Sequence, residues 1–101
     1  MKYEDLDDQL DLICDAIISI KDRKTCKNFL KDICTINELY SLVQRLQVAY
    51  MLNNNKTYQE IADETHASTA TISRVNRCLN YGEKGYKDVL NNLPDDAGKK
   101  N

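Results

Sequence analysis

The placement of glycine and proline most constrains what this chain can fold into. Of its 101 residues three are glycine and one is proline, and all four lie at or beyond Gly82. Because these two residues interrupt helices more often than any others, everything before Gly82 is compatible with helix. The sequence therefore predicts an all-α fold of about six helices. At this length we expect one helical domain over residues 1–93.

The N-terminal half is predicted to form dimerisation helices over residues 3–53. The first helix has apolar residues at three- and four-residue steps, which is the period of one helical face. These residues are Leu6, Leu10, Ile13, Ile17 and Ile20. A second helix is expected from Asp22 to Ile33, and its inward residues are expected to be Cys26, Phe29, Leu30 and Ile33.

A third helix is predicted to begin at Thr35 and to end near Leu52. Thr35 precedes Glu38 by three residues, the spacing of a capping box, and three successive asparagines at 53–55 end the helix. Its apolar residues are Leu39, Leu42, Val43, Leu46 and Ala49 on one face, extended by Val48, Met51 and Leu52. A helix that is apolar over most of its circumference must be covered from several sides, so we expect a partner subunit.

Residues 57–80 have the pattern of a helix-turn-helix. Thr57 and Glu60 form a second capping box, and Thr65-His66-Ala67 is the expected turn. Ser68 or Thr69 is expected to cap the next helix, whose buried residues are predicted to be Ile72, Val75 and Leu79. His66 stands where glycine is common because φ is positive there, a region that histidine visits more than most residues.

A last helix is predicted over residues 83–93, with Tyr86, Val89, Leu90 and Leu93 as its apolar residues. Pro94 ends it, because proline lacks an amide hydrogen and restricts the residue before it. Residues 94–101 are polar and are predicted to be disordered.

The formal net charge is −2, but the charges are unevenly placed. Six acidic residues and one lysine lie in residues 1–15, whereas four basic residues and one glutamate lie in residues 68–87. A basic C-terminal segment on an acidic body is typical of a protein that contacts DNA with one surface.

We expect double-stranded DNA to be bound by exposed residues of the two motif helices. Short side chains near the start of the second helix let its backbone approach base edges, and residues at the start of the first helix can reach phosphates. The predicted DNA-binding residues are Lys56, Tyr58, Gln59, Ser68, Thr69, Ala70, Ser73, Arg74 and Arg77. In the helix over 22–33, Arg23 and the lysines are expected to be a solvated face rather than a second DNA contact.

No metal site, catalysis or membrane segment is expected. The four cysteines form no Cys-x-x-Cys pair and there is one histidine, so zinc-ligand spacing is absent. We expect Cys14, Cys26, Cys34 and Cys78 to be reduced, buried apolar residues. No nucleophile–base set, paired carboxylates or phosphate loop accompanies His66, and no apolar run reaches about 18 residues, so a cytoplasmic, non-enzymatic protein is expected.

The segment Thr69-Ala-Thr-Ile-Ser-Arg74, preceded by the long helix from Thr35, resembles the Trp repressor superfamily, and more closely its TrpR-like YerC/YecD-type branch. The resemblance covers about residues 6–93. It implies six helices and an intertwined homodimer in which the N-terminal helices of each subunit wrap the other.

The resemblance also implies an effector pocket that includes Thr35, Arg45 and Arg74. Two further pocket positions differ from the Trp repressor, because Val75 replaces a glycine and Cys78 replaces a serine. Tryptophan is therefore not expected as a ligand or cofactor, whereas another small carboxylate could still bind. Arg45 and Arg74 have an equally simple interpretation as surface or interface ion pairs.

The sequence thus predicts a homodimeric DNA-binding transcriptional regulator, a repressor that reads palindromic sites. The alternative is a helical protein-interaction module with a vestigial DNA-binding hairpin.

Overall fold

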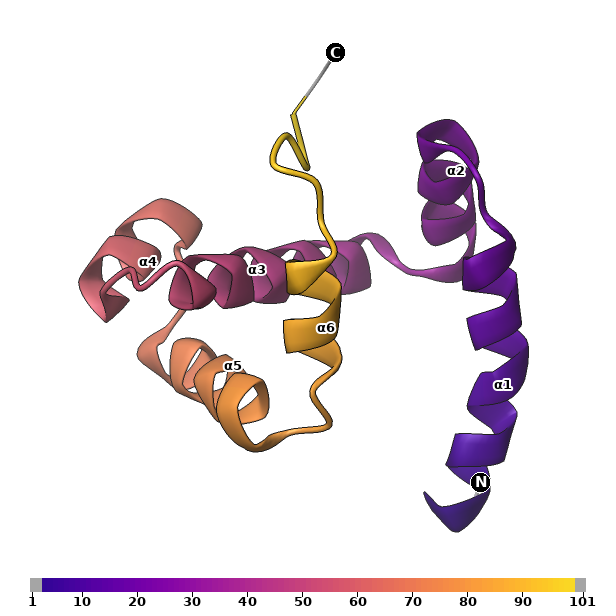
Figure 1. Ribbon diagram of the computed structural model, residues 1–101, viewed down its shortest axis with the longest axis horizontal. Coiled ribbons are helices and arrows are strands. Elements are labelled where there is room, and N and C mark those ends of the chain that lie inside the picture. The colour runs from indigo at the N-terminus through magenta and orange to yellow at the C-terminus, as the bar shows by residue number, and fades with distance from the viewer. Residues whose placement is uncertain (1–2, 100–101) are drawn as a thin grey trace. The chain divides into compact units, whose positions relative to one another are not determined.

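The computed structural model describes the backbone of residues 3–99 and the side chains of residues 5–99. Within this range it contains six helices and no strand, so the all-α prediction is confirmed (Figure 1). The helices are α1 (Tyr3–Ser19), α2 (Arg23–Ile33), α3 (Ile36–Asn53), α4 (Tyr58–Thr65), α5 (Thr69–Tyr81) and α6 (Gly85–Asn91).

The chain divides into two compact units, residues 1–39 and residues 40–101. The first holds α1, α2 and the start of α3, and the second holds the rest. The single domain expected over 1–93 stays a prediction, and residues 1–2 lie outside the described range. The disorder expected for 94–101 also stays a prediction. Before residues 100–101, which are not described, the chain makes a turn in which the Ala97 amide donates to the Pro94 carbonyl (3.0 Å).

The starts of α2 and α3 are fixed by side-chain caps. Asp22 accepts a hydrogen bond from the Thr25 amide (2.7 Å), so it caps α2 rather than beginning it. The capping box predicted for α3 is confirmed, because the Thr35 amide donates to Glu38 (2.8 Å) and the Glu38 amide donates to Thr35 Oγ1 (3.1 Å). The bonds that the Thr25 and Thr35 amides donate favour the ionised carboxylates of Asp22 and Glu38. The pKa of each carboxyl group therefore lies below its ordinary value.

The core of the second unit is an apolar cluster to which α3, α4, α5, α6 and the turn between α4 and α5 all contribute. Its buried residues are Val48, Ala49, Ile61, Ala67, Ile72, Val75, Leu79 and Leu90. The buried face predicted for the second motif helix, Ile72, Val75 and Leu79, is therefore confirmed.

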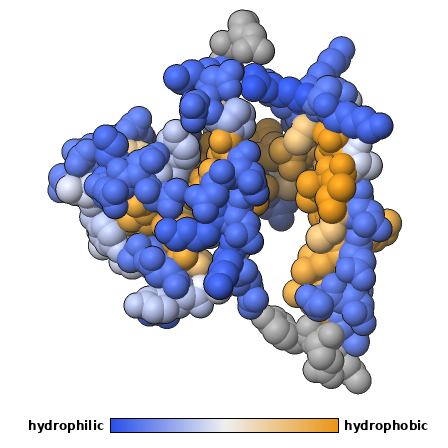
Figure 2. All heavy atoms as spheres, viewed as in Figure 1, coloured by the Kyte–Doolittle hydropathy of each residue, from blue (hydrophilic) through white to orange (hydrophobic). Residues whose placement is uncertain are grey.

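Part of the apolar surface of α3 is left uncovered by the described residues. Val48 and Ala49 are fully buried, whereas Leu42, Val43 and Leu46 are 41%, 53% and 43% exposed. Figure 2 shows further apolar side chains at the molecular surface over α1. The apolar surface of α3 is thus broader than the described residues cover.

The last helix is shorter than the predicted 83–93. Lys84 has a left-handed backbone (φ 68°), so α6 begins only at Gly85, and it ends at Asn91 ahead of Pro94. Leu90 is buried, whereas Val89, which the sequence gives as another apolar residue of this helix, is 53% exposed.

Two burial predictions are wrong. Ile33 is 50% exposed rather than inward, and α2 contains no buried residue at all. The cysteines are not buried either, since Cys14 and Cys78 are exposed and Cys26 and Cys34 are half-buried. All four are free thiols.

The turn between α4 and α5 takes the predicted form without glycine. His66 ends α4 in the left-handed conformation (φ 62°, ψ 16°), and its amide donates to the Ala62 carbonyl (2.9 Å). Ser68, rather than Thr69, then caps α5 by accepting from the Thr71 amide (3.1 Å). A non-glycine residue in this conformation carries a steric penalty.

We therefore expect His66→Gly to raise the free energy of unfolding by about 0.5–1 kcal/mol, since glycine adopts positive φ without steric cost. The matched control is Glu64→Gly, which places glycine in the last turn of α4 and should instead lower the free energy of unfolding by about 0.5–1 kcal/mol. Urea denaturation measures both. A His66→Gly variant less stable than the parent would mean that the imidazole makes contacts that outweigh the strain.

Candidate nucleic-acid interface

The two sides of α5 differ sharply in chemistry. Ile72, Val75 and Leu79 face the core at three- and four-residue spacing. The residues on the opposite side, all exposed, are Thr69, Ala70, Ser73, Arg74 and Arg77. No carboxylate lies in α5 to oppose the two arginines. Within the described residues neither guanidinium has a hydrogen bond or an ion pair, so both are available to an external anion.

The start of α4 presents the remaining predicted contacts. Lys56, Tyr58 and Gln59 are all exposed beside the Thr57 cap, whose capping box with Glu60 is formed (Thr57 Oγ1 to the Glu60 amide, 3.1 Å). Gln59 is not free, because its amide Nε2 donates to Asp63 Oδ1 (2.8 Å) one turn later. The sequence pattern did not single out Asp63, although the four-residue spacing of the pair could have indicated it.

Ser68 has a structural role in addition to its exposure. Its Oγ accepts from the Thr71 amide and also donates to Thr71 Oγ1 (3.1 Å). The hydroxyl therefore fixes the first turn of α5, which holds Thr69 and Ala70 at the exposed N-terminus. In this geometry Ser68 contributes to the exposed surface by capping α5.

A hydrogen bond from α3 positions the helix-turn-helix. Gln44 Nε2 donates to the carbonyl of Thr65 (3.2 Å), across 21 positions of sequence. Thr65 Oγ1 in turn donates to the Ile61 carbonyl (2.7 Å) and accepts from the Ala67 amide (3.2 Å). Gln44 and Thr65 thus fix the end of α4 and the turn, and nothing in the local sequence pattern indicated the bond from Gln44.

The residues predicted for an effector pocket lie in different surroundings. Val75 is 2% exposed and belongs to the core, whereas Arg45, Arg74 and Cys78 are exposed. Arg74 and Cys78 lie one turn apart on α5. Thr35 lies in the first unit, where its hydroxyl is used by the α3 capping box. The effector pocket stays a prediction.

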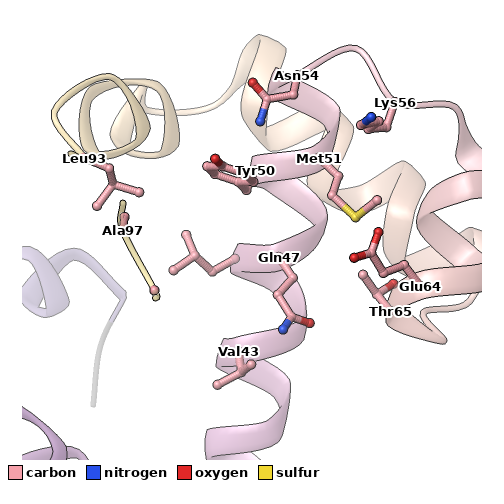
Figure 3. Close-up of a pocket in the computed structure, with 12 residues that line it drawn as sticks. Val43, Gln47, Tyr50, Met51, Asn54, Lys56, Glu64, Thr65, Leu93 and Ala97 are labelled. Atoms are coloured by element: carbon pink, nitrogen blue, oxygen red, sulfur yellow. The ribbon is translucent and has the colours of Figure 1, made fainter. Parts of the chain in front are cut away.

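A separate groove of about 820 Å³ runs along α3 and contains none of those five residues. Figure 3 shows Val43, Gln47 and Tyr50 projecting from the helix, with Leu93 and Ala97 on one side and Glu64 and Thr65 on the other. The groove is mainly apolar along the helix and polar near Asn54 and Lys56. It is therefore suited to a partner with an apolar surface.

Among the described residues, no three of His, Cys, Asp or Glu lie together in a way that could hold a metal ion. In the same part of the chain no helix has the length and apolarity needed to span a membrane.

Comparison with known proteins gives a consistent result. The sequence profile of the family described as Trp repressor protein matches residues 8–94. The uncharacterized protein YerC of Bacillus subtilis (strain 168) is 53% identical over 85 residues, which cover 84% of this chain and 82% of YerC.

Two solved structures share the fold. A TrpR-like protein from Eubacterium eligens superposes with a TM-score of 0.78 at 51% identity, covering 83% of this chain and 87% of the other. A candidate Trp repressor from Staphylococcus aureus superposes with a TM-score of 0.81 at 47% identity, covering 90% and 92%. The helix order, the capped helix-turn-helix and these similarities lead to one conclusion: the chain belongs to the Trp repressor family, in the TrpR-like branch that includes YerC.

Proposed function

We propose that the protein is a sequence-specific transcriptional regulator, a repressor that binds palindromic DNA as a homodimer. The observation that carries the proposal is the two-sided character of α5. Its apolar side is anchored in the core by Ile72, Val75 and Leu79, and its other side presents hydroxyls, a methyl group and two arginines. This arrangement supports insertion of the helix into a major groove.

Each exposed residue has a distinct expected part in binding. Thr69, Ala70 and Ser73 are short, so they allow the N-terminal half of α5 to approach the bases closely. Arg77, further along the helix, suits a phosphate contact, and Lys56 and Tyr58 suit the backbone on the other side of the turn. Because Gln44 and Ser68 hold the turn and the first turn of α5, this surface is formed before DNA arrives.

We expect Arg77→Ala to weaken binding to all duplexes by a similar factor. If each guanidinium neutralises one phosphate, the slope of log affinity against log salt should fall by about 1 per protomer. Thr69→Ala and Ser73→Ala should instead change which bases are preferred. Fluorescence anisotropy on duplexes selected from a random pool measures both effects. Arg77→Lys is the matched control, because it keeps the charge and should keep most of the salt slope. Failure of the parent protein to bind selected duplexes above the non-specific level would contradict the proposal.

The homodimer is supported by the surface that one chain leaves uncovered. Leu42, Val43 and Leu46 of α3 are each more than 40% exposed, and Val43 and Leu46 line the groove beside Tyr50. Exposed apolar surface along one helix is typical of an interface. To read a palindromic site, the two-fold dimer would need its two copies of α5 about 34 Å apart, the spacing of successive major grooves on one side of DNA.

We expect light scattering at micromolar concentration to give twice the chain mass of 11.6 kDa. Leu46→Glu should shift the mass toward the monomer, because it places a charge in the apolar groove. Ser41→Glu, at an exposed position on another face of α3, is the matched control and should leave the dimer intact. A parent protein that remains at monomer mass would refute the homodimer.

We further infer that L-tryptophan is not the effector. Val75 fills core volume at the position where the resemblance implies an indole ring, and it is 2% exposed. A ligand there would have to displace packed atoms, which typically costs about 1–3 kcal/mol, and each 1.4 kcal/mol lowers affinity about tenfold. Cys78 supplies only a weak hydrogen-bond partner in place of a hydroxyl. A smaller carboxylate held by Arg45 and Arg74 remains compatible with this proposal.

Calorimetry with L-tryptophan should therefore show no micromolar binding to the parent protein. Val75→Gly should gain binding if the branched side chain is the obstacle, and Val75→Ala provides a second, less disruptive variant. Because both create a cavity, each variant is first checked for a cooperative unfolding transition. Micromolar binding by the parent protein would overturn the steric argument.

A further inference from the structure

The helix α2 carries a second cationic surface, separate from the helix-turn-helix. Lys24, Lys27 and Lys31 recur at three- and four-residue steps, so they share one side of the helix, and all three are exposed. The half-buried residues Cys26 and Phe29 lie on the opposite side. We call Lys24, Lys27 and Lys31 the lysine stripe.

Nothing in the described part of the chain neutralises the lysine stripe. The three ammonium groups have no hydrogen bond or ion pair with any described residue, although α1 carries exposed aspartates in the same unit. Lys24 also stands in the first turn of α2, which contains no acidic residue. A cation is disfavoured there by the helix dipole, so the stability of α2 does not explain its presence.

We propose that the lysine stripe is a second DNA-binding surface that contacts the phosphate backbone without reading sequence. This rests on the proposed function, and it replaces the solvated face expected from the sequence. From the first lysine to the last, the stripe rises about 10 Å along the helix axis at 1.5 Å per residue. Phosphates of one DNA strand follow each other at about 3.4 Å along the axis, so the length of the stripe corresponds to about three intervals between successive phosphates.

The chemistry of the stripe favours DNA over a protein surface. Next to the lysines this side of α2 carries Asn28, which is exposed, and no apolar or aromatic residue lies between them. Protein interfaces are depleted in lysine and are built around apolar anchors, whereas DNA interfaces are rich in cations. Lysine is a flexible and hydrated point charge, so it binds phosphate without a fixed geometry. A contact that does not read the base sequence requires this property.

The test is the salt dependence of binding to a selected duplex that extends well beyond the site on both sides. The full chain is compared with the Lys24→Gln/Lys27→Gln/Lys31→Gln variant. Glutamine keeps helix propensity and length but removes the charge. If all three lysines neutralise phosphates, the slope of log affinity against log salt should fall by about 2 to 3 per protomer, with the preferred sequence unchanged. The Lys24→Arg/Lys27→Arg/Lys31→Arg variant, which keeps the charge, should retain the slope of the parent.

The outcomes separate this inference from the proposed function. If the glutamine variant keeps the parent slope while Arg77→Ala lowers it, the stripe does not contact DNA and the helix-turn-helix reads DNA alone. If the glutamine variant keeps the slope but dissociates into monomers in sedimentation, the stripe pairs with an acidic surface of a second copy, which also overturns the inference. Absence of DNA binding by the parent protein would instead refute the proposed function. Far-ultraviolet circular dichroism confirms that each variant is folded.

Discussion

The burial of Val48 and Ala49 in α3 is the interaction on which the rest of the second unit depends. Both are fully buried, and α4, α5 and α6 pack residues such as Ile61, Ile72 and Leu90 into the same cluster. The helices α4 and α6 contain only eight and seven residues. Isolated helices of this length are not stable in water, so they exist because the cluster holds them. Each fully buried valine or isoleucine contributes about 1.5–3 kcal/mol.

The helix α3 has two roles, on different sides. One side of α3 organises the core and, through Gln44, fixes the turn that aims α5. Another side presents Val43, Leu46 and Tyr50 in an open groove. Thr65 belongs to both surfaces, because it lines the groove and its carbonyl accepts the hydrogen bond from Gln44.

The surfaces proposed to meet DNA owe their form to caps as well as to burial. Thr57 and Ser68 satisfy amides at the starts of α4 and α5, and Asp22 does the same for α2. Each cap leaves the exposed residues of the first turns in a defined position while using little apolar surface. A protein with a small core can thereby present ordered polar surfaces on short helices.

The sequence by itself determined the order of the helices, the two capping boxes and the inward side of α5. Capping boxes, the three-and-four periodicity of Ile72, Val75 and Leu79, and the turn at His66 all act within a few residues, so they can be read from a linear chain. The residues proposed to bind DNA were predicted as exposed for the same reason, and all nine are exposed.

Only the tertiary structure decided which apolar residues are covered. Ile33 fits an inward pattern yet is half exposed, because a periodic pattern shows where a face lies and not whether another element reaches it. The left-handed Lys84 shortened α6, and the bond from Gln44 to Thr65 joins positions 21 residues apart. The groove along α3 likewise forms from residues between Val43 and Gly98. These features depend on how distant segments pack, and packing is set by the whole fold rather than by any local run of sequence.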